Sequence, residues 1–259
     1  MINGTLPSET SKGIIRMIRD DMRSIMEPNF ILVGNHDTNT IYGNNMEAAL
    51  TEAEMYALWG RHNEKIVQGR PGNVPYCYKD YDSLGLRVLY LSSSMGDYTH
   101  GTNGDNWGFP LAERDWLENE ALNTNYQVLM FSHMPMSQGY ISRSNALPYN
   151  GPSMIETVAN FQSRGGIVVG LINGHTHFDY VHDNGHFKEI AVASQKFLGN
   201  TEDASGTAVY PFCPSTGVAP GRTDNTVTQD LWNILVVKPI ERECKIIRFG
   251  AGNDVTWTY

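Results

Sequence analysis

The chain has 259 residues, of which 41% are hydrophobic and 18% charged, and this ordinary composition excludes a mainly disordered protein. Its net charge of −9 and its pI of about 5.3 argue against a broad nucleic-acid surface, because such a surface needs clustered Lys and Arg. No apolar stretch approaches the ~20 residues of a membrane-spanning helix. The three cysteines form no CxxC pair, and their odd number favours a reducing compartment such as the cytoplasm while leaving the localisation open.

The first two thirds of the chain predict alternating helices and strands, which is typical of an α/β protein. Apolar residues at helical spacing predict helices over residues 8–26, 51–65, 111–122 and 153–161. Short apolar runs predict buried strands over residues 30–33, 86–91, 127–131 and 167–172.

The last third of the chain is rich in strand patterns. Residues 178–182 and 187–193 flank the turn 183–185 and predict a hairpin, and residues 232–237 and 244–249 predict a second one. Residues 199–229 are rich in Gly, Pro, Ser, Thr and Asp, and predict a long loop. With no internal repeat, the chain is expected to form one mixed α/β domain over residues 1–259, with two layers of sheet.

Three motifs with the same organisation carry the chemistry. Gly34-Asn-His-Asp37, Ser132-His-Met-Pro135 and Gly174-His-Thr-His177 each follow a predicted buried strand. Ligands of open α/β sheets bind outside the carboxyl ends of the strands, so four histidines, an Asn and an Asp should meet at one edge. Imidazole nitrogens and amide or carboxylate oxygens suit zinc, manganese or iron. Each His taken alone is more typical of a solvated side chain, and the metal site rests on the conjunction.

This set of motifs resembles the calcineurin-like metallophosphoesterase family over most of the chain. The helix around Glu113-Arg-Asp-Trp-Leu117 is also similar to the one that precedes the His133 strand in that family. The resemblance implies an α/β/β/α sandwich of two mixed sheets flanked by helices, with two divalent metal ions between the sheets. It also implies hydrolysis of phosphomonoesters or phosphodiesters by attack of metal-bound hydroxide.

The resemblance also implies roles for individual residues. Asn35, His133 and His175 match ligands of the second metal, and His177 matches a ligand of the first. His36 matches a histidine near the leaving-group oxygen, where an imidazole can act as general acid. Asp37 is expected to orient His36 through the other ring nitrogen.

Two motifs of the family pattern do not precede Gly34, namely the strand ending Asp-x-His and the strand ending Gly-Asp. The chain is therefore expected to lack the N-terminal strands, and to retain three ligands for one metal and His177 alone for the other. Asp20 and Asp21 are candidate replacement ligands, although their helical pattern favours a solvated face.

The sequence thus predicts a metal-dependent phosphoesterase whose activity is impaired in this chain. The alternative is a non-catalytic metal- or phosphate-binding module. Arg143 is a candidate for binding a phosphate oxygen. Expected substrates are small-molecule, nucleotide or lipid phosphate esters; the sequence does not choose among them, nor does it indicate the metal or the oligomeric state.

Overall fold

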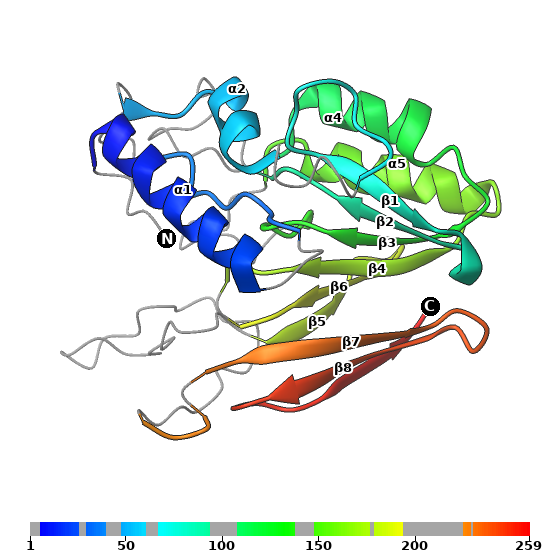
Figure 1. Cartoon of the computed structure of the whole chain (residues 1–259). Helices are drawn as coiled ribbons and strands as arrows, with labels where there is room; N and C mark the ends of the chain where they lie inside the picture. Colours follow the sequence, from blue (N-terminus) through cyan, green and yellow to red (C-terminus); the bar gives the residue numbers. More distant parts are fainter. Residues whose placement is uncertain are drawn as a thin grey trace.

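The computed structural model describes residues 6–25, 30–39, 48–60, 67–93, 108–137, 148–176, 179–193, 225–228 and 230–259. Its strands form two sheets, and its helices lie beside the larger one (Figure 1). The helical elements are α1 (Ser8–Ile25), α2 (Glu52–Met55), η3 (Tyr56–Gly60), η4 (Asp82–Leu84), α4 (Leu111–Trp116), η5 (Leu117–Ala121) and α5 (Gly151–Ser163). The strands are β1 (Cys77–Tyr81), β2 (Leu86–Tyr90), β3 (Gln127–Phe131), β4 (Val168–Asn173), β5 (Tyr180–Asp183), β6 (Lys188–Ala191), β7 (Trp232–Lys238), β8 (Glu243–Phe249) and β9 (Val255–Thr258).

The larger sheet is mixed, with the strand order β1-β2-β3-β4-β6-β5. Strands β2, β3, β4 and β6 are parallel, and β1 and β5 pair antiparallel at the two edges. Because neighbouring parallel strands end at the same edge, the segments that follow β3 and β4 emerge next to each other. This edge carries the two histidine motifs of the second half of the chain.

The second sheet is antiparallel, in the order β7-β8-β9, and packs against the first through an apolar layer. Leu129 and Val169 of the first sheet belong to the same buried cluster as Ile246 and Trp257 of the second. The indole Nε1 of Trp257 donates a hydrogen bond to the carbonyl of Val169 at 2.7 Å. The next residue, Gly170, has φ +150°, and a Cβ there would lie 3.3 Å from that indole nitrogen. The two sheets are therefore tied by a polar bond as well as by apolar contact.

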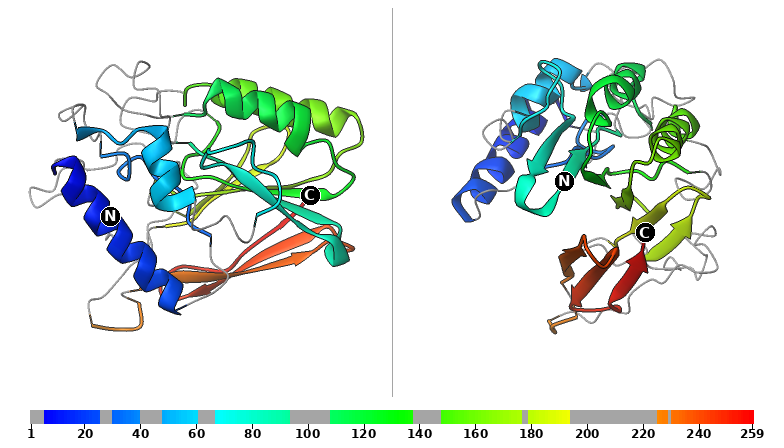
Figure 2. Two further views of the ribbon diagram at one scale, coloured as in Figure 1. Left: turned by 45° about the horizontal axis from the view of Figure 1, so that its top comes forward. Right: turned by 90° about the vertical axis from the view of Figure 1, so that its right-hand side faces the viewer.

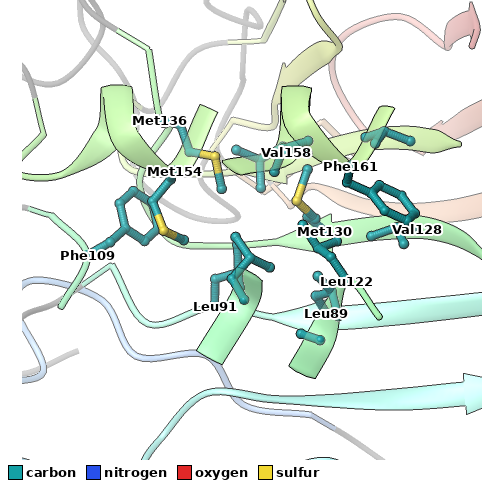
Figure 3. Packing of buried hydrophobic residues seen from close by; sticks show 14 of the residues in the cluster. Leu89, Leu91, Phe109, Leu122, Val128, Met130, Met136, Met154, Val158 and Phe161 are labelled. Atoms are coloured by element: carbon teal, nitrogen blue, oxygen red, sulfur yellow. The ribbon is translucent and has the colours of Figure 1, made fainter. Parts of the chain in front are cut away.

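The opposite face of the larger sheet is covered by helices. Met154, Val158 and Phe161 lie on one face of α5 because they are spaced by four and three residues. They share a buried cluster with Val128 and Met130 of β3 (Figure 3). Burial of each such side chain stabilises the packing of α5 on β3 by roughly 1.5–3 kcal/mol.

The described layers are thus helix, sheet and sheet (Figures 1 and 2). The expected pair of packed sheets with flanking helices is confirmed, but the second sheet is antiparallel rather than mixed. None of the helices in the described ranges covers its outer face, where Trp232 and Phe249 stack with ring centroids 4.8 Å apart and remain exposed. The fourth, helical layer of the expected sandwich therefore has no counterpart in the described part of the chain.

The prediction of a strand over residues 30–33 is wrong. The segment is not part of either sheet, although its side chains alternate as those of a strand do. Phe30 and Leu32 pack against the core between the sheets, whereas Ile31 and Val33 pack against the core under α1. The ring of Phe30 stacks on Tyr90 of β2 with centroids 3.8 Å apart. Alternating burial on two cores gives this segment the hydrophobic pattern of a strand, and that pattern does not distinguish it from a strand of either sheet.

The remaining predicted strands are confirmed to within about two residues, as are the helices around α1, α4–η5 and α5. Strands β1 and β9 were not predicted, because β1 carries two charges and β9 is only four residues long. The second predicted helix is described as far as Gly60, and residues 61–66 lie outside the described ranges. Of the predicted loop 199–229, only residues 225–228 are described. The single-domain assignment stays a prediction.

A search of the described helices for one long and apolar enough to cross a membrane finds none.

Candidate metal centre

Three polar side chains meet at the carboxyl edge of the larger sheet. His133 follows β3, His175 follows β4, and Asn35 follows the extended segment 30–33. Nε2 of His133 lies 2.9 Å from Oδ1 of Asn35 and 3.3 Å from Nδ1 of His175. The two imidazole rings are nearly perpendicular, with centroids 5.2 Å apart. Residues separated by 98 and 42 positions in the chain thus direct ligand-type atoms at one another.

The segment that carries Asn35 is a turn closed by its own side chains. The carboxylate of Asp37 accepts the backbone N–H of Gly34 at 2.9 Å, and the hydroxyl of Thr38 donates to the carbonyl of Asn35 at 2.8 Å. These bonds compete successfully with helix or strand pairing, as short polar side chains do in turns. Asn35 itself is only 8% exposed, so its amide is held in a fixed direction rather than solvated.

Asn39 anchors this turn to the first helix. It is fully buried at φ +61°, and its amide Nδ2 donates to the carbonyls of Leu6 and Ala48 at 2.8 and 2.9 Å. Its Oδ1 accepts the hydroxyl of Ser11 in α1 at 2.9 Å. The sequence analysis did not identify Asn39, and its place two residues after Asp37 is a weak signal of an αL turn residue.

Close approach between Gly34 and His133 explains why the first motif begins with glycine. A Cβ at Gly34 would lie 3.2 Å from Cε1 of the His133 ring and 3.3 Å from both ring nitrogens. A residue with a Cβ at this position would require the imidazole to move by a few tenths of an ångström. Gly34 therefore allows the first motif to pack closely against His133, which lies in the other half of the chain.

His175 has a strained backbone. Its φ of +61° lies in the left-handed region, which a residue with a Cβ occupies at a cost of about 1–2 kcal/mol. The neighbouring residue, Gly174, donates its N–H to the carbonyl of His133 at 3.0 Å and so links the two loops. Strain of this kind persists where the surroundings hold it, and it often marks a functional site.

Asp37 and His36 occupy the outer part of the same turn, and both are half-buried. Burial raises the pKa of the Asp37 carboxyl, and its hydrogen bond from Gly34 acts in the opposite direction. The bond to Gly34 shows that Asp37 shapes the turn. Its expected role of orienting His36 stays a prediction.

The other sequence-predicted residues are either outside the described ranges or exposed on α1. His177 and Arg143 lie outside the described ranges, and so do most residues of the loop 199–229. Asp20 is exposed on α1 and bonds its neighbour Arg19. Asp21 is exposed on the same helix. The solvated-face interpretation of these two carboxylates is thus the one that the structure supports.

The three convergent side chains fit a divalent metal ion. Two nitrogen ligands at ~2.0–2.1 Å from one tetrahedral ion lie about 3.3 Å apart, and the two imidazole nitrogens have this separation. Two imidazoles with an amide oxygen form a donor set that zinc, manganese and iron accept. Among the described residues, however, no group of three or more His, Cys, Asp or Glu side chains could hold a metal ion. The described part of the site thus brings together three ligand-type side chains, one of them an amide.

Comparisons with known proteins agree with the fold. The chain is similar to the crystal structure of a dimetal phosphatase from Danio rerio, with a TM-score of 0.59 and 13% sequence identity over 97% of this chain and 78% of that one. No protein-family model matches the sequence, and no curated protein matches it either. At this identity the likeness shows a shared fold, with mixed α/β architecture.

Proposed function

We propose that this protein is a metal-dependent phosphoesterase. The observation that carries the proposal is the convergence of Asn35, His133 and His175 at 2.9 and 3.3 Å, at the carboxyl edge of a sheet whose fold resembles a dimetal phosphatase. The three side chains hold the ion through Oδ1, Nε2 and Nδ1 respectively. His177, placed by the motif Gly174-His-Thr-His177, is proposed as a ligand of a second ion, which is manganese, zinc or iron like the first.

The chain's own residues supply positioning and a proton. A bound divalent cation supplies charge stabilisation to a phosphoryl oxygen and activates water for hydrolysis. His36, one residue after Asn35, is proposed to donate a proton to the departing alkoxide as general acid. Asp37 is proposed to set the ring orientation of His36. With a net charge of −9, the protein relies on bound cations rather than on its overall field to attract an anionic ester.

The substrate is proposed to be a small-molecule, nucleotide or lipid phosphate ester, and Arg143 to bind one of its phosphate oxygens. The choice between monoesters and diesters is decided by assay with p-nitrophenyl phosphate and bis(p-nitrophenyl) phosphate.

Metal content is the first test of the proposal. The protein is loaded with Mn²⁺ or Zn²⁺ and dialysed, and the metal bound per chain is counted by elemental analysis alongside the two ester assays. Two ions per chain with hydrolysis support the dinuclear enzyme, and one ion with hydrolysis supports a mononuclear one. A chain that retains no metal and hydrolyses neither ester contradicts the proposal.

A second candidate is a metal-binding module without catalysis. It is favoured by one observation, that no carboxylate accompanies the two histidines and the Asn in the described part of the site. A site with two ions can stabilise both the attacking and the leaving oxygen of a phosphoryl group, and a single ion cannot do this. One bound ion per chain with no hydrolysis of either ester would identify this second function.

His36 distinguishes catalysis from binding. His36→Gln removes the proposed proton donor and keeps the turn, so metal content should stay at the wild-type value. Turnover should fall by about 10²-fold or more for esters with poor leaving groups, and much less for p-nitrophenyl esters, whose leaving group needs little protonation. Equal losses on both kinds of ester would contradict the general-acid role.

A further inference from the structure

Strand β6 carries a buried carboxylate that is not one of the predicted metal ligands. Glu189 is 0% exposed, in a strand whose other residues are mostly apolar. Its Oε2 accepts the backbone N–H of Met136 at 2.9 Å and that of Ser137 at 3.4 Å. Its Oε1 accepts Nδ2 of Asn184 at 2.8 Å. A carboxylate is expensive to bury unless its oxygens are paired, and here both have partners.

The two backbone groups bound by Glu189 belong to the His133 loop, residues 132–137. This loop leaves β3, and β4 lies between β3 and β6 in the sheet, so the bond to Glu189 reaches past a whole strand. The loop is also fixed nearer to His133, because the N–H of Met134 donates to the hydroxyl of Ser93 at 2.9 Å. The loop therefore has anchors on both neighbours of β3 and on the strand beyond.

The other side of the His133 loop is blocked by α5. A Cβ at Gly151, the first residue of α5, would lie 2.2 Å from the carbonyl oxygen of Met136. The helix backbone thus touches the loop directly, while Glu189 holds the opposite edge of the same peptide segment. With Met136 fixed from both sides, the chain three residues earlier has little freedom to turn the His133 ring away from Asn35.

Asn184 extends this support to the β5–β6 hairpin. Its Oδ1 accepts the N–H groups of His186 and Phe187 at 3.1 and 3.0 Å, so its amide cannot flip without losing both bonds. Its Nδ2 must then face Glu189 as a donor. The pair is directional, and an exchange of donor and acceptor between the two residues should preserve it.

We propose that Glu189 is a positioning residue for the metal centre, which holds the His133 loop through Met136 and Ser137 so that His133 faces Asn35 and His175. This inference rests on the proposed function for its metal-binding consequence. The contacts on which it depends are those of Glu189 with the loop and with Asn184.

Amide hydrogen exchange and Mn²⁺ affinity test the proposal together. Glu189→Gln presents a donor to the donor of Asn184, and we expect faster exchange at the Met136 and Ser137 amides. We expect a roughly 10-fold weaker Mn²⁺ affinity, at the low end of the effect of groups that support metal ligands. Glu189→Met removes both acceptors and should weaken affinity by up to about 100-fold.

A double variant separates positioning from general stability. Asn184→Asp in the Glu189→Gln background reverses donor and acceptor, and should restore both the amide protection and the Mn²⁺ affinity. Asp80→Asn is the matched control, because it breaks a partly buried carboxylate contact at the opposite end of the strands. The control should lower the unfolding temperature and speed exchange at Met136 no more than the global loss of stability requires, while leaving Mn²⁺ affinity unchanged.

The outcomes distinguish this inference from the proposed function. If exchange at Met136 and Ser137 and Mn²⁺ affinity in Glu189→Gln match those of the Asp80→Asn control, Glu189 does not position the loop. Failure of Asn184→Asp to rescue would also overturn the proposal. If the wild-type protein binds no Mn²⁺, the proposed function fails, and the exchange data with the rescue still decide whether Glu189 holds the His133 loop.

Discussion

Buried polar side chains differ in their hydrogen bonding between the two ends of the larger sheet. At the amino end, Arg87 is bound by both oxygens of Asp80 at 2.7 and 2.8 Å and by the carbonyl of Ala121 at 2.9 Å, and its guanidinium stacks 3.7 Å from the ring centre of Tyr78. At the carboxyl end, both amide atoms of the buried Asn173 have no hydrogen-bond partner in the structure as described. That end also holds the left-handed backbone of His175.

Arg87 at the amino end is fully paired, whereas Asn173 at the carboxyl end is not, as is also true of Trp116 and Arg248 elsewhere among the described residues. Buried polar groups in native proteins are nearly always satisfied, so an exception requires a reason. Folded proteins break such local rules mainly at functional sites. Under the proposed function, the amino end is a structural clamp, and the carboxyl end, where Asn35, His133 and His175 meet, is the binding end.

The largest expected effect comes from removing a ligand at the carboxyl end. His133→Ala and His175→Ala should each lower metal affinity by more than about 100-fold, since a ligand is worth at least as much as the groups that support it. Isothermal titration with Mn²⁺ and Zn²⁺ measures this loss. Metal uptake that survives both substitutions would show that these residues are not the ligands.

At the amino end, Asp80→Asn should affect stability alone. It leaves the charge of Arg87 unbalanced, and we expect a loss of about 2–3 kcal/mol in the free energy of unfolding. This is below the usual range for a buried pair because the side chains of Arg87 and Asp80 keep 9% and 15% exposure. Denaturation in urea measures the loss. A change in metal content in this variant would contradict the assignment of a purely structural role to the amino end of the sheet.

Backbone strain provides a smaller, matched comparison. Arg242 has φ +54°, close to the +61° of His175, but it lies in the β7–β8 hairpin of the second sheet. Arg242→Gly should raise the free energy of unfolding by about 0.5–1 kcal/mol, because glycine accepts this φ at the cost of some chain entropy. Thermal unfolding tests this. His175→Gly relieves the same strain and should abolish metal uptake. If this variant is more stable and still binds metal, the strained backbone of His175 does not serve metal binding.

The smallest effect is expected at the two cysteines of the core between the sheets, Cys77 and Cys244. Burial raises the pKa of Cys77 to about 12 and that of Cys244 to about 12. At about pH 8 only some one in 10,000 of these thiols is ionised, and the thiolate is the reactive form. Iodoacetamide should leave both unmodified in the native protein and modify both in denaturant, as read by peptide mass spectrometry. Rapid native labelling of either cysteine would show that this core opens.

The two histidine motifs of the second half were predictable because each follows a strand of the usual kind. Strands β3 and β4 are continuous apolar runs, and parallel order places their ends together. The prediction was less successful at residues 30–33, which are buried like a strand but are not assigned to either sheet. Asn39 and Glu189 were missed for a different reason. Their partners lie far from them in the chain, in α1 and in the His133 loop.

The sequence by itself determined the types of the proposed ligands, their order along the chain and the strands that precede two of them, because period and composition are local properties. Tertiary structure alone decided the 2.9 and 3.3 Å separations of Asn35, His133 and His175, the close approach of Gly34 to the His133 ring, and the contact of the His133 loop with Glu189. These depend on contacts between distant segments. Such contacts are set by how the layers pack, and no local pattern records them.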